Sequence, residues 1–288
     1  MNKKCNLADL HIHSIYSDGT DDVLSLIEKI NKKGILFFSV TDHDTVDFYK
    51  NIDYRKLGNV KLIPGIEFSC ITDVGKCHIL GYGIDVNNVV LKNTLNQIQT
   101  RRKRKLDKRL SYLKENHNII FDNSVVFSLQ NTSSVGKPHI ARQLVNLKKS
   151  ENISDAIEKY LMNIPGDDDD NISPKEAIST ILSAGGIPIW AHPLGEEGRK
   201  SLDKDKFDNQ LRILLNAGIK GVEYYYSRYS EEDLSFIKSG LLRNGCFDLM
   251  YLSGGSDYHG DVKNIQLGSL SADNKHIPCE LLTVLQNL

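Results

Sequence analysis

The stretch ADLHIHSIYSDGT, residues 8–20, joins a short apolar run to two histidines and an aspartate. The run predicts a strand over residues 6–11. Because residues i and i+2 of a strand point to the same face, His11 and His13 could reach one metal ion. A lone His-x-His pair is weak evidence for a metal, and Asp18 by itself is typical of a Ser-Asp-Gly turn. The meaning of these residues therefore depends on what the rest of the chain places beside them.

Apolar, β-branched runs alternate with amphipathic ones along most of the chain. Strands are expected at residues 6–11, 35–41, 60–66, 78–84, 187–191, 221–225 and 249–253. Helices are expected between them at residues 22–33, 174–184, 208–217 and 231–243. Such alternation predicts a mainly parallel sheet with right-handed crossovers. Seven strands favour an α/β fold that is a seven-strand relative of the (β/α) barrel, with an open doubly wound sheet as the alternative.

One segment interrupts this rhythm. Residues 85–166 contain no second good strand, and the helical patterns cover 90–115, 139–147 and 154–162. We therefore expect residues 1–88 and 167–288 to form the barrel, and 89–166 to form a helical insertion that contributes to the substrate pocket. Four adjacent acids follow at residues 167–170, and we expect a solvated turn there in preference to a metal site.

The composition is that of an ordinary soluble protein. The 288 residues carry a net charge of -1, which argues against a protein that coats nucleic acid. No apolar run approaches the ~18 residues of a membrane span, and the first ten residues lack the apolar core of a signal peptide. Five cysteines without a Cys-x-x-Cys pair fit reduced thiols. We expect a cytoplasmic location, no membrane contact and no obligate protein partner.

Nine histidines against a single tryptophan are the one unusual feature of the composition. Six of the nine, together with three carboxylates, lie at the edges of predicted strands: His11, His13, Asp18, His43, Glu67, His78, His192, Asp257 and His259. Active sites of parallel barrels form where strands end and loops begin. Nine nitrogen and oxygen ligands exceed what one ion takes, so we expect two to three divalent ions. Mn²⁺ is favoured, with Fe²⁺ or Zn²⁺ as alternatives.

Six motifs carry a resemblance to a known family. DLHIHSIYSDGT, TDHDT, PGIE, CHILGYG, AHP and GSDYHG, in this order from about residue 7 to 268, resemble the PHP (polymerase and histidinol phosphatase) superfamily. The resemblance implies a distorted seven-strand (β/α) barrel and metal-dependent phosphoesterase activity. GKPHIAR, residues 136–142, is similar to a motif of the stand-alone bacterial members. Those are nucleoside 3',5'-bisphosphate phosphatases and 5'-to-3' exoribonucleases acting on short 5'-phosphorylated RNA.

The resemblance also implies how the ligands are shared among three ions. The first ion would be held by His11, His13, Glu67 and Asp257. The second would be held by Glu67 as a bridge, His78 and His192. The third would be held by Asp18, His43 and His259. All of these positions carry residue types that can bind a metal.

Two clusters of basic residues are candidates for substrate binding. Residues 101–109 read RRKRKLDKR, and either Arg101 or Arg104 could hold a second phosphate, or the whole run could be a solvated helix face. The second cluster is Lys137, His139 and Arg142, where Lys137 replaces the arginine that the subgroup tends to have. His139 could donate to phosphate, act as the acid for the leaving oxygen, or merely pack or cap. Arg199 is a further phosphate candidate.

We therefore expect a phosphoesterase in which a metal-bridging hydroxide attacks phosphorus in line, with His139, Asp18 and His43 as catalytic residues. The substrate would be a nucleotide, such as a 3',5'-bisphosphate, or a short 5'-phosphorylated oligonucleotide. Histidinol phosphate phosphatase is an alternative, against which the GKPHIAR motif argues. Another is a non-catalytic, metal-stabilised regulatory domain, which would require lost ligands. A further alternative is a polymerase-associated proofreading module, which would have to act in trans on a polymerase in another chain.

Overall fold

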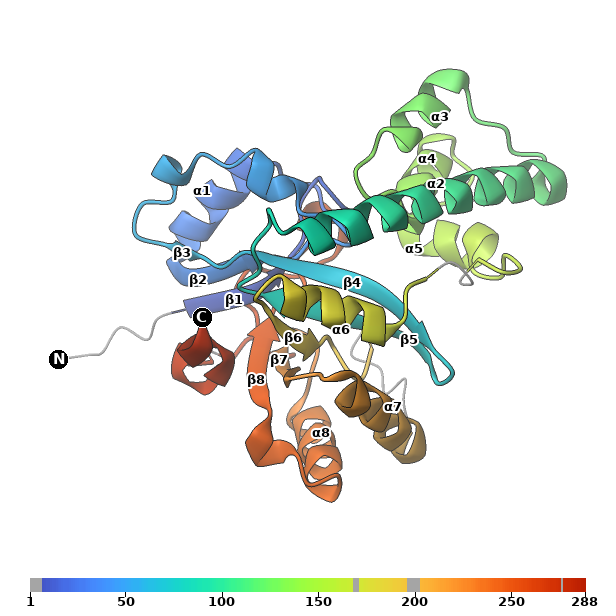
Figure 1. The fold of residues 1–288 in the computed structure, drawn as a ribbon. Helices are drawn as coiled ribbons and strands as arrows, with labels where there is room; N and C mark the ends of the chain where they lie inside the picture. Colours follow the sequence, from blue (N-terminus) through green and yellow to red (C-terminus); the bar gives the residue numbers. More distant parts are fainter. Residues whose placement is uncertain (1–6, 168–170, 196–202, 276) are drawn as a thin grey trace.

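The computed structural model describes residues 7–167, 171–195, 203–275 and 277–288. Within them the strands form two sheets, one in the order β1-β2-β3 and the other in the order β4-β5-β6-β7-β8 (Figure 1). The strand bounds are β1 Leu7–Ile12, β2 Ile35–Val40, β3 Lys61–Leu62, β4 Gly65–Thr72, β5 Gly75–Tyr82, β6 Ile187–Trp190, β7 Gly221–Tyr226 and β8 Tyr251–Gly255. The architecture is therefore mixed α/β.

The helices follow the amphipathic patterns closely. Their bounds are α1 Val23–Lys33, α2 Val89–His117, α3 Asn123–Gln130, α4 Lys137–Asn146, α5 Ile153–Ala156, α6 Pro174–Ser183, α7 Lys204–Ala217 and α8 Glu231–Arg243. Gly34 ends α1 with a φ of 71°, and the Ser173 side chain caps α6 by accepting from the Glu176 amide. The sequence patterns did not predict α3. None of the helices in the described ranges is both long and apolar enough to cross a bilayer.

The expectation of a mainly parallel sheet is wrong for β4, β5 and β6. In the structure β5 pairs antiparallel with both β4 and β6. The connection between β4 and β5 contains only Asp73 and Val74, and so short a link permits only antiparallel pairing. The single strand expected over residues 60–66 is broken into β3 and β4 at Pro64, which has no amide hydrogen to donate to a sheet. This region therefore holds a hairpin instead of a β-α-β unit.

Continuous strand pairing does not close the described strands into a barrel, but backbone contacts join the two sheets at both sides. Beyond β8, the Asp257 amide donates to the His11 carbonyl at 2.8 Å. Beyond β2, the Asp44 amide donates to the Glu67 carbonyl at 2.9 Å. At Gly255 a Cβ atom would lie only 2.1 Å from the His11 Cβ, so a glycine is required for this approach. These contacts join β1 to β8 and β2 to β4.

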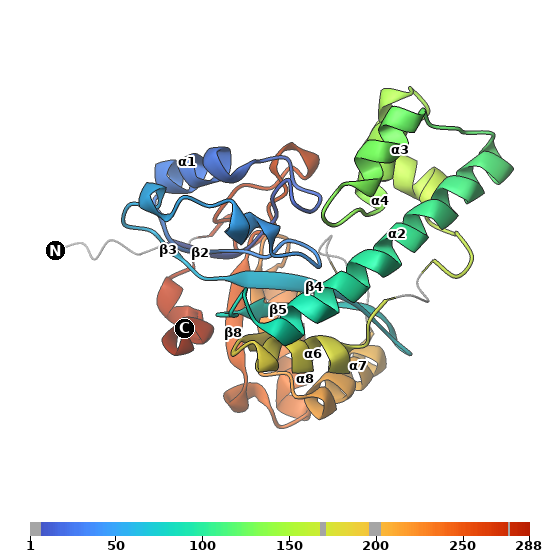
Figure 2. The ribbon, with the colours of Figure 1, turned by 45° about the horizontal axis from the view of Figure 1, so that its top comes forward.

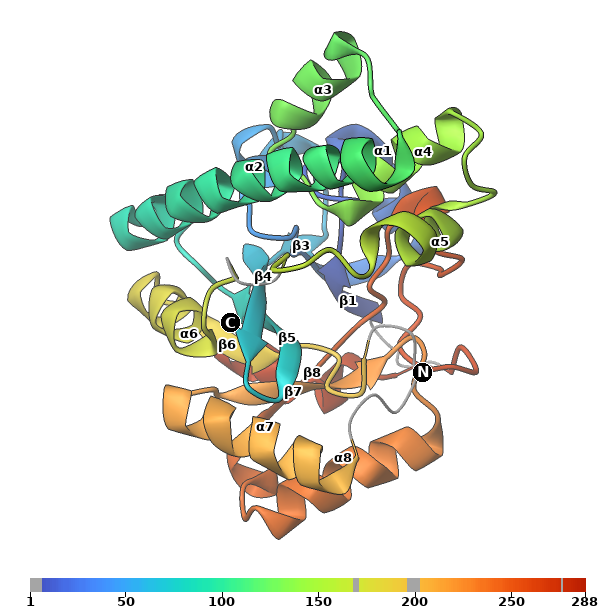
Figure 3. The same ribbon diagram turned by 90° about the vertical axis from the view of Figure 1, so that its right-hand side faces the viewer.

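Helices cover the sheets from outside. Helix α1 lies beside the first sheet, whereas α6, α7 and α8 lie beside the second (Figures 1 and 3). Helix α6 packs directly on β4, β5 and β6. Their apolar faces share one core, in which the Trp190 and Phe207 rings lie 5.1 Å apart. The core thus holds the strands that carry most of the candidate ligands.

Helix α2 runs away from the sheets, and α3, α4 and α5 gather along its distal half (Figure 2). These helices bury an apolar cluster of their own. Its members include Leu106, Leu113, Phe121, Ile140, Leu144 and Leu161. The helical segment expected from the sequence is therefore present between β5 and α6, with α3 in addition.

The solvated turn expected at residues 167–170 is wrong at Asp167; residues 168–170 lie outside the described ranges. The Asp167 carboxylate is buried and accepts from Arg109 Nε at 2.7 Å. Its other oxygen lies 3.0 Å from Lys137 Nζ. A buried carboxylate is stable only when paired, and here cations on α2 and α4 pair with it. The sequence did not indicate this buried pairing, because four adjacent acids are typical of a surface turn.

Candidate metal centre and adjoining cationic pocket

All nine candidate ligands converge at one end of the strands. His11 lies within β1 and His13 directly after it, while His192 follows β6 and both Asp257 and His259 follow β8. Glu67 and His78 lie inside β4 and β5, not at the third strand's end and the fourth strand's start as expected. Because β4 and β5 are antiparallel neighbours, these two interior positions still reach the shared site. Asp18 and His43 enter it from the loops after β1 and β2.

Glu67 lies at the centre of the cluster. Its Oε1 atom is 2.9 Å from His78 Nδ1 and 3.0 Å from His192 Nε2. Its Oε2 atom faces three further imidazoles, at 3.1 Å from His43 Nδ1, 3.2 Å from His13 Nε2 and 3.3 Å from His11 Nε2. Each oxygen of Glu67 therefore faces a different set of imidazoles. A carboxylate that bridges two metal ions needs such an arrangement.

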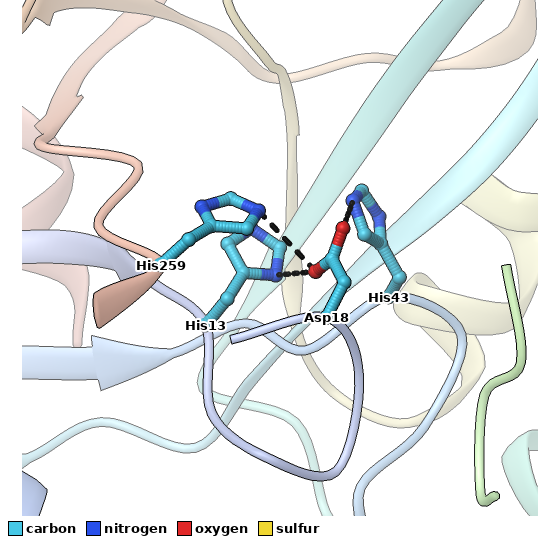
Figure 4. A group of neighbouring side chains, drawn as sticks. All are labelled: His13, Asp18, His43 and His259. Carbon is cyan, nitrogen blue, oxygen red and sulfur yellow. Dashed lines mark ion pairs between the residues drawn. The ribbon is translucent and has the colours of Figure 1, made fainter. Parts of the chain in front are cut away.

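A second group surrounds Asp18 (Figure 4). Asp18 Oδ1 lies 3.2 Å from His259 Nε2 and 3.7 Å from His13 Nδ1. Asp18 Oδ2 lies 3.9 Å from His43 Nε2. One ligand atom from each of these four residues lies within 4.8 Å of the others. The structure thus brings together the expected set of Asp18, His43 and His259, and adds His13 to it.

The remaining groupings differ in detail from the expected sets. His11, His13 and Asp257 form one group, with Asp257 Oδ1 at 3.2 Å from His13 Nε2. His78 and His192 contact the same Glu67 oxygen but fall into separate groups. His78 groups with His43 and Glu67, and His192 groups with His11 and Glu67. Glu67 is common to both, consistent with a bridging position.

Several buried atoms in this cluster lack the partners that buried polar groups need. Within the described part of the chain, Asp18 Oδ1, His43 Nδ1 and Glu67 Oε2 accept or donate no hydrogen bond. Two imidazole nitrogens, His11 Nε2 and His13 Nε2, lie 3.1 Å apart. Such desolvated groups are costly when unsatisfied. Imidazole and carboxylate ligands without cysteine suit divalent cations, so the residues present fit bound metal ions.

The electrostatics of the cluster agree with this fit. Burial opposes protonation of His13, but the adjacent Asp257 and Glu67 carboxylates raise its pKa to about 10. Burial would raise the pKa of Glu67, but the neighbouring His43 and His11 hold it well below its usual value. The negatively charged carboxylates therefore favour positively charged groups in the cluster. Divalent cations displace protons from such ligand atoms when they bind.

Buried partners orient the candidate ligands, and the sequence analysis missed them. His11 Nδ1 lies 2.9 Å from Glu223 Oε1, which leaves Nε2 to face the cluster. Glu223 also accepts from the His192 amide at 2.8 Å. The Tyr226 hydroxyl and Lys263 Nζ each donate to Asp257 Oδ2 at 2.7 Å. Glu67 was expected because a carboxylate directly follows an apolar run, and the carboxylate inside the expected strand over residues 221–225 could have identified Glu223 by similar reasoning.

A cavity of about 250 Å³ adjoins the cluster at Asp18, His43 and His78. Helices α2 and α4 form its other wall. Its lining contains six basic side chains, namely Lys76, Arg101, Arg102, Lys105, Arg109 and Lys137. Two carboxylates, Asp18 and Asp44, line it as well. Since cations outnumber carboxylates, the cavity is suited to an anionic ligand, and we call it the insert pocket.

The expected substrate residues are distributed unevenly around the insert pocket. Arg101, Lys137 and His139 line it, whereas Arg104 and Arg142 are not among its lining residues. Arg104 lies on an exposed part of α2, and Arg199 lies outside the described residues. Four basic residues of the pocket were not expected individually from the sequence, namely Lys76, Arg102, Lys105 and Arg109. The spacing of three and four residues among the last three places them on one helix face, which could have identified them.

His139 lies at the start of α4, where its Nδ1 atom accepts a hydrogen bond from the Gly136 amide at 3.1 Å. This contact caps the helix, one of the roles considered for it. Because Nδ1 is the acceptor, a neutral ring carries its proton on Nε2. Burial lowers the pKa of His139, which favours this neutral form. The ring is therefore fixed in a tautomer that can donate from Nε2.

The fold and the site together define a class: an α/β protein with a buried histidine and carboxylate cluster, suited to divalent cations, beside a cationic pocket. The model of the PHP domain family matches residues 9–276. The chain therefore belongs to the PHP domain family, as its motifs led us to expect.

Curated relatives are enzymes that act on phosphate esters. The chain is 26% identical to a 3',5'-nucleoside bisphosphate phosphatase of Chromobacterium violaceum, over 87% of this chain and 86% of the relative. It is 28% identical to the 5'-3' exoribonuclease Rnm of Escherichia coli, over 90% and 87%. It is 26% identical to a phosphoribosyl 1,2-cyclic phosphate 1,2-diphosphodiesterase of Eggerthella lenta, over 88% and 94%.

Solved structures share the fold. An amidohydrolase from Chromobacterium violaceum with bound sulfate matches with a TM-score of 0.75 and 24% identity, over 90% of this chain and 89% of that chain. A provisionally assigned metal-dependent phosphoesterase from Bifidobacterium adolescentis matches with a TM-score of 0.76 and 24% identity, over 93% and 94%. At this level of identity the likeness establishes the fold alone.

Proposed function

We propose that this chain is a metal-dependent phosphoesterase that hydrolyses nucleotides, such as 3',5'-bisphosphates, or short 5'-phosphorylated oligonucleotides. One observation carries the proposal: the nine-residue cluster opens directly into the insert pocket with its six basic residues. A phosphate at the cluster would leave the remainder of an anionic substrate among these cations. The names of the curated relatives, a phosphatase, an exoribonuclease and a phosphodiesterase, support the same chemistry.

We propose two to three divalent ions, with Mn²⁺ favoured. His11, His13 and Asp257 would hold one ion, and Asp18, His43 and His259 would hold another. Glu67 would bridge toward His78 and His192, in line with its two oxygens facing different imidazoles. When bound, the ions would supply Lewis acidity toward water and phosphoryl oxygens, which is the chemistry that phosphate ester hydrolysis requires.

The chain's own pocket residues would bind and orient the substrate. Arg101 makes a long 4.0 Å contact with Glu176 and no shorter ion pair within the described residues, so its guanidinium could bind a phosphate group that is not being hydrolysed. His139 would donate from Nε2 to a substrate oxygen, because the Gly136 amide occupies Nδ1. Lys137 is held by Asp167 and would add positive charge more than a direct hydrogen bond.

The proposal extends to the organisation of the chain. Residues 1–88 and 167–288 would form a distorted seven-strand PHP barrel, which the backbone contacts of His11 and Glu67 across the two sheets support. Residues 89–166 would form the insertion that completes the substrate pocket, which the separate apolar cluster around Leu106 and Ile140 supports. The buried free thiols at Cys70, Cys77, Cys246 and Cys279 fit a cytoplasmic location.

The test is a comparison of substrates with purified, Mn²⁺-loaded protein. We expect release of phosphate from adenosine 3',5'-bisphosphate, or of mononucleotide from a 5'-phosphorylated trinucleotide, with a kcat/KM well above that for histidinol phosphate. Preference for histidinol phosphate would assign the chain to the other enzymatic branch. Absence of hydrolysis of all three esters, with the metals shown to be bound, would overturn the proposal.

Arg101→Met tests the role of the insert pocket. Loss of one charge-assisted hydrogen bond is expected to raise KM for a 3',5'-bisphosphate about tenfold, with a smaller change in kcat. Steady-state phosphate release measures both constants.

Arg104→Met is the matched control, because it removes the same charge from the same helix outside the pocket lining. Its KM is expected to stay close to that of the wild type. Equal effects of the two substitutions would show that the helix acts only through its overall charge.

A further inference from the structure

A second polar cavity lies beside the turn that follows β7. Its volume is about 430 Å³, and it shares no lining residue with the insert pocket. Its polar lining comes from Ser227, Arg228, Asn264, Gln266, Ser269 and Asn274. Among the described residues that line it, none is a carboxylate. The cavity therefore carries one positive charge and no acidic group to neutralise it.

Two donors in this lining are buried without a partner. Arg228 Nε and Ser227 Oγ make no hydrogen bond within the described ranges, and Ser227 is 7% exposed. A buried guanidinium nitrogen or hydroxyl without a partner is destabilising, and such groups usually bind water, an ion or a ligand. Both atoms belong to consecutive residues, so one ligand could satisfy both.

The amide side chains of the lining contribute further donors. Gln266 Oε1 already accepts from Lys33 Nζ at 3.0 Å, which leaves the Gln266 amide nitrogen available. Asn274 Oδ1 accepts from Ser269 Oγ at 2.6 Å, which leaves the Asn274 amide nitrogen available. In both cases the acceptor atom is engaged and the donor atom remains. Within the described residues, these two amide groups therefore offer the cavity mainly donors.

We propose that this cavity is an oxyanion site that binds a phosphoryl group. A guanidinium, a hydroxyl and two amide nitrogens match the acceptor oxygens of phosphate in charge and in number. The site shares no lining residue with the insert pocket and contains none of the nine candidate ligands. Its occupant would be either a phosphate of a larger ligand or free inorganic phosphate, which share this chemistry.

The cavity is connected to the metal-ligand cluster through Asp257. Ser227 follows Tyr226, whose hydroxyl donates to Asp257 Oδ2, and Asn264 follows Lys263, whose ammonium group donates to the same oxygen. Both segments that form the cavity thus begin at a residue that holds this candidate ligand. An anion bound at Arg228 would stabilise the two segments that position Asp257.

The site can be located with selenate as an anomalous phosphate mimic, soaked into crystals of the full, metal-loaded chain. We expect an anomalous peak within hydrogen-bonding distance of Arg228, lost in Arg228→Met and retained at lower occupancy in Arg228→Lys. Arg243→Met is the matched control, because Arg243 pairs with Asp208 on the surface and the peak should remain. No peak at Arg228 in the wild type, or an equal peak in Arg228→Met, would overturn the proposal.

Solution binding of inorganic phosphate completes the test by calorimetry on the metal-loaded protein. We expect one class of sites to weaken about tenfold or more in Arg228→Met and to stay unchanged in Arg243→Met. Unchanged binding in Arg228→Met, or no phosphate binding at millimolar concentration, would contradict the proposal. Because the readout is binding, a failure of the proposed hydrolytic activity would leave this result interpretable.

The two sources of the phosphoryl group give different kinetics. If a substrate phosphate occupies the site, Arg228→Met raises KM for adenosine 3',5'-bisphosphate. If free phosphate occupies it, KM stays unchanged and the inhibition constant for phosphate rises. Either result supports the site and assigns its occupant, whereas no change in either constant contradicts it.

Discussion

Glu67→Gln is expected to lower kcat for phosphate release by on the order of a thousand-fold. Glu67 Oε1 faces His78 and His192, whereas its Oε2 faces His13. An amide has a similar shape but carries no negative charge, so it cannot offset the charge of two adjacent cations. The measurement is steady-state phosphate release, with metal content determined by elemental analysis.

Glu232→Gln is the matched control, because Glu232 is exposed on α8. Its activity and metal content should equal those of the wild type. If Glu67 bridges metal ions, Glu67→Gln should lose bound metal together with activity. Full activity in Glu67→Gln, at unchanged metal content, would exclude a bridging role for this carboxylate.

Asp167→Asn is expected to destabilise the protein by about 3 kcal/mol, the usual cost of removing one partner from a buried ion pair. Asp167 is 4% exposed, and its oxygens contact Arg109 Nε and Lys137 Nζ. Without the carboxylate, the two cations on α2 and α4 lose the counter-charge that Asp167 supplies. Urea unfolding, followed by tryptophan fluorescence and by circular dichroism, measures the change.

The control is Asp107→Asn, since Asp107 is exposed on α2, two residues from Arg109. Its free energy of unfolding should change by less than about 0.5 kcal/mol. A similarly small change in Asp167→Asn would mean that the pairing seen in the structure does not stabilise the insertion.

Much of the site could be predicted from the sequence because its ligands are chemically distinctive. Histidines such as His11 and His192 next to apolar runs are hard to explain as core residues, and all nine proposed ligands meet in space. The helix patterns were equally informative, since α8 has the bounds expected from its apolar spacing and α1 ends at Gly34. The residue types and their local spacing were sufficient to predict both the candidate ligands and these helices.

Pairing between segments was harder to predict, because it depends on contacts that are distant in sequence. The antiparallel hairpin of β4 and β5 was missed because the expected strands ended at residue 66 and began again at residue 78. In the structure β4 continues to Thr72 and β5 begins at Gly75, so only a tight turn separates them. Asp167 was misassigned because its partners, Arg109 and Lys137, are 58 and 30 residues earlier in the chain. Glu223 was missed for the same reason, since its role depends on His11.

We propose above all that the histidine and carboxylate cluster holds divalent ions that support hydrolysis of a phosphate ester. The most direct measurement is phosphate release from adenosine 3',5'-bisphosphate by one protein sample in three states: Mn²⁺-loaded, stripped with a chelator, and reloaded. We predict turnover in the first state, loss of turnover in the second and recovery in the third. Turnover that is unchanged after stripping, with metal removal verified by elemental analysis, would contradict the claim.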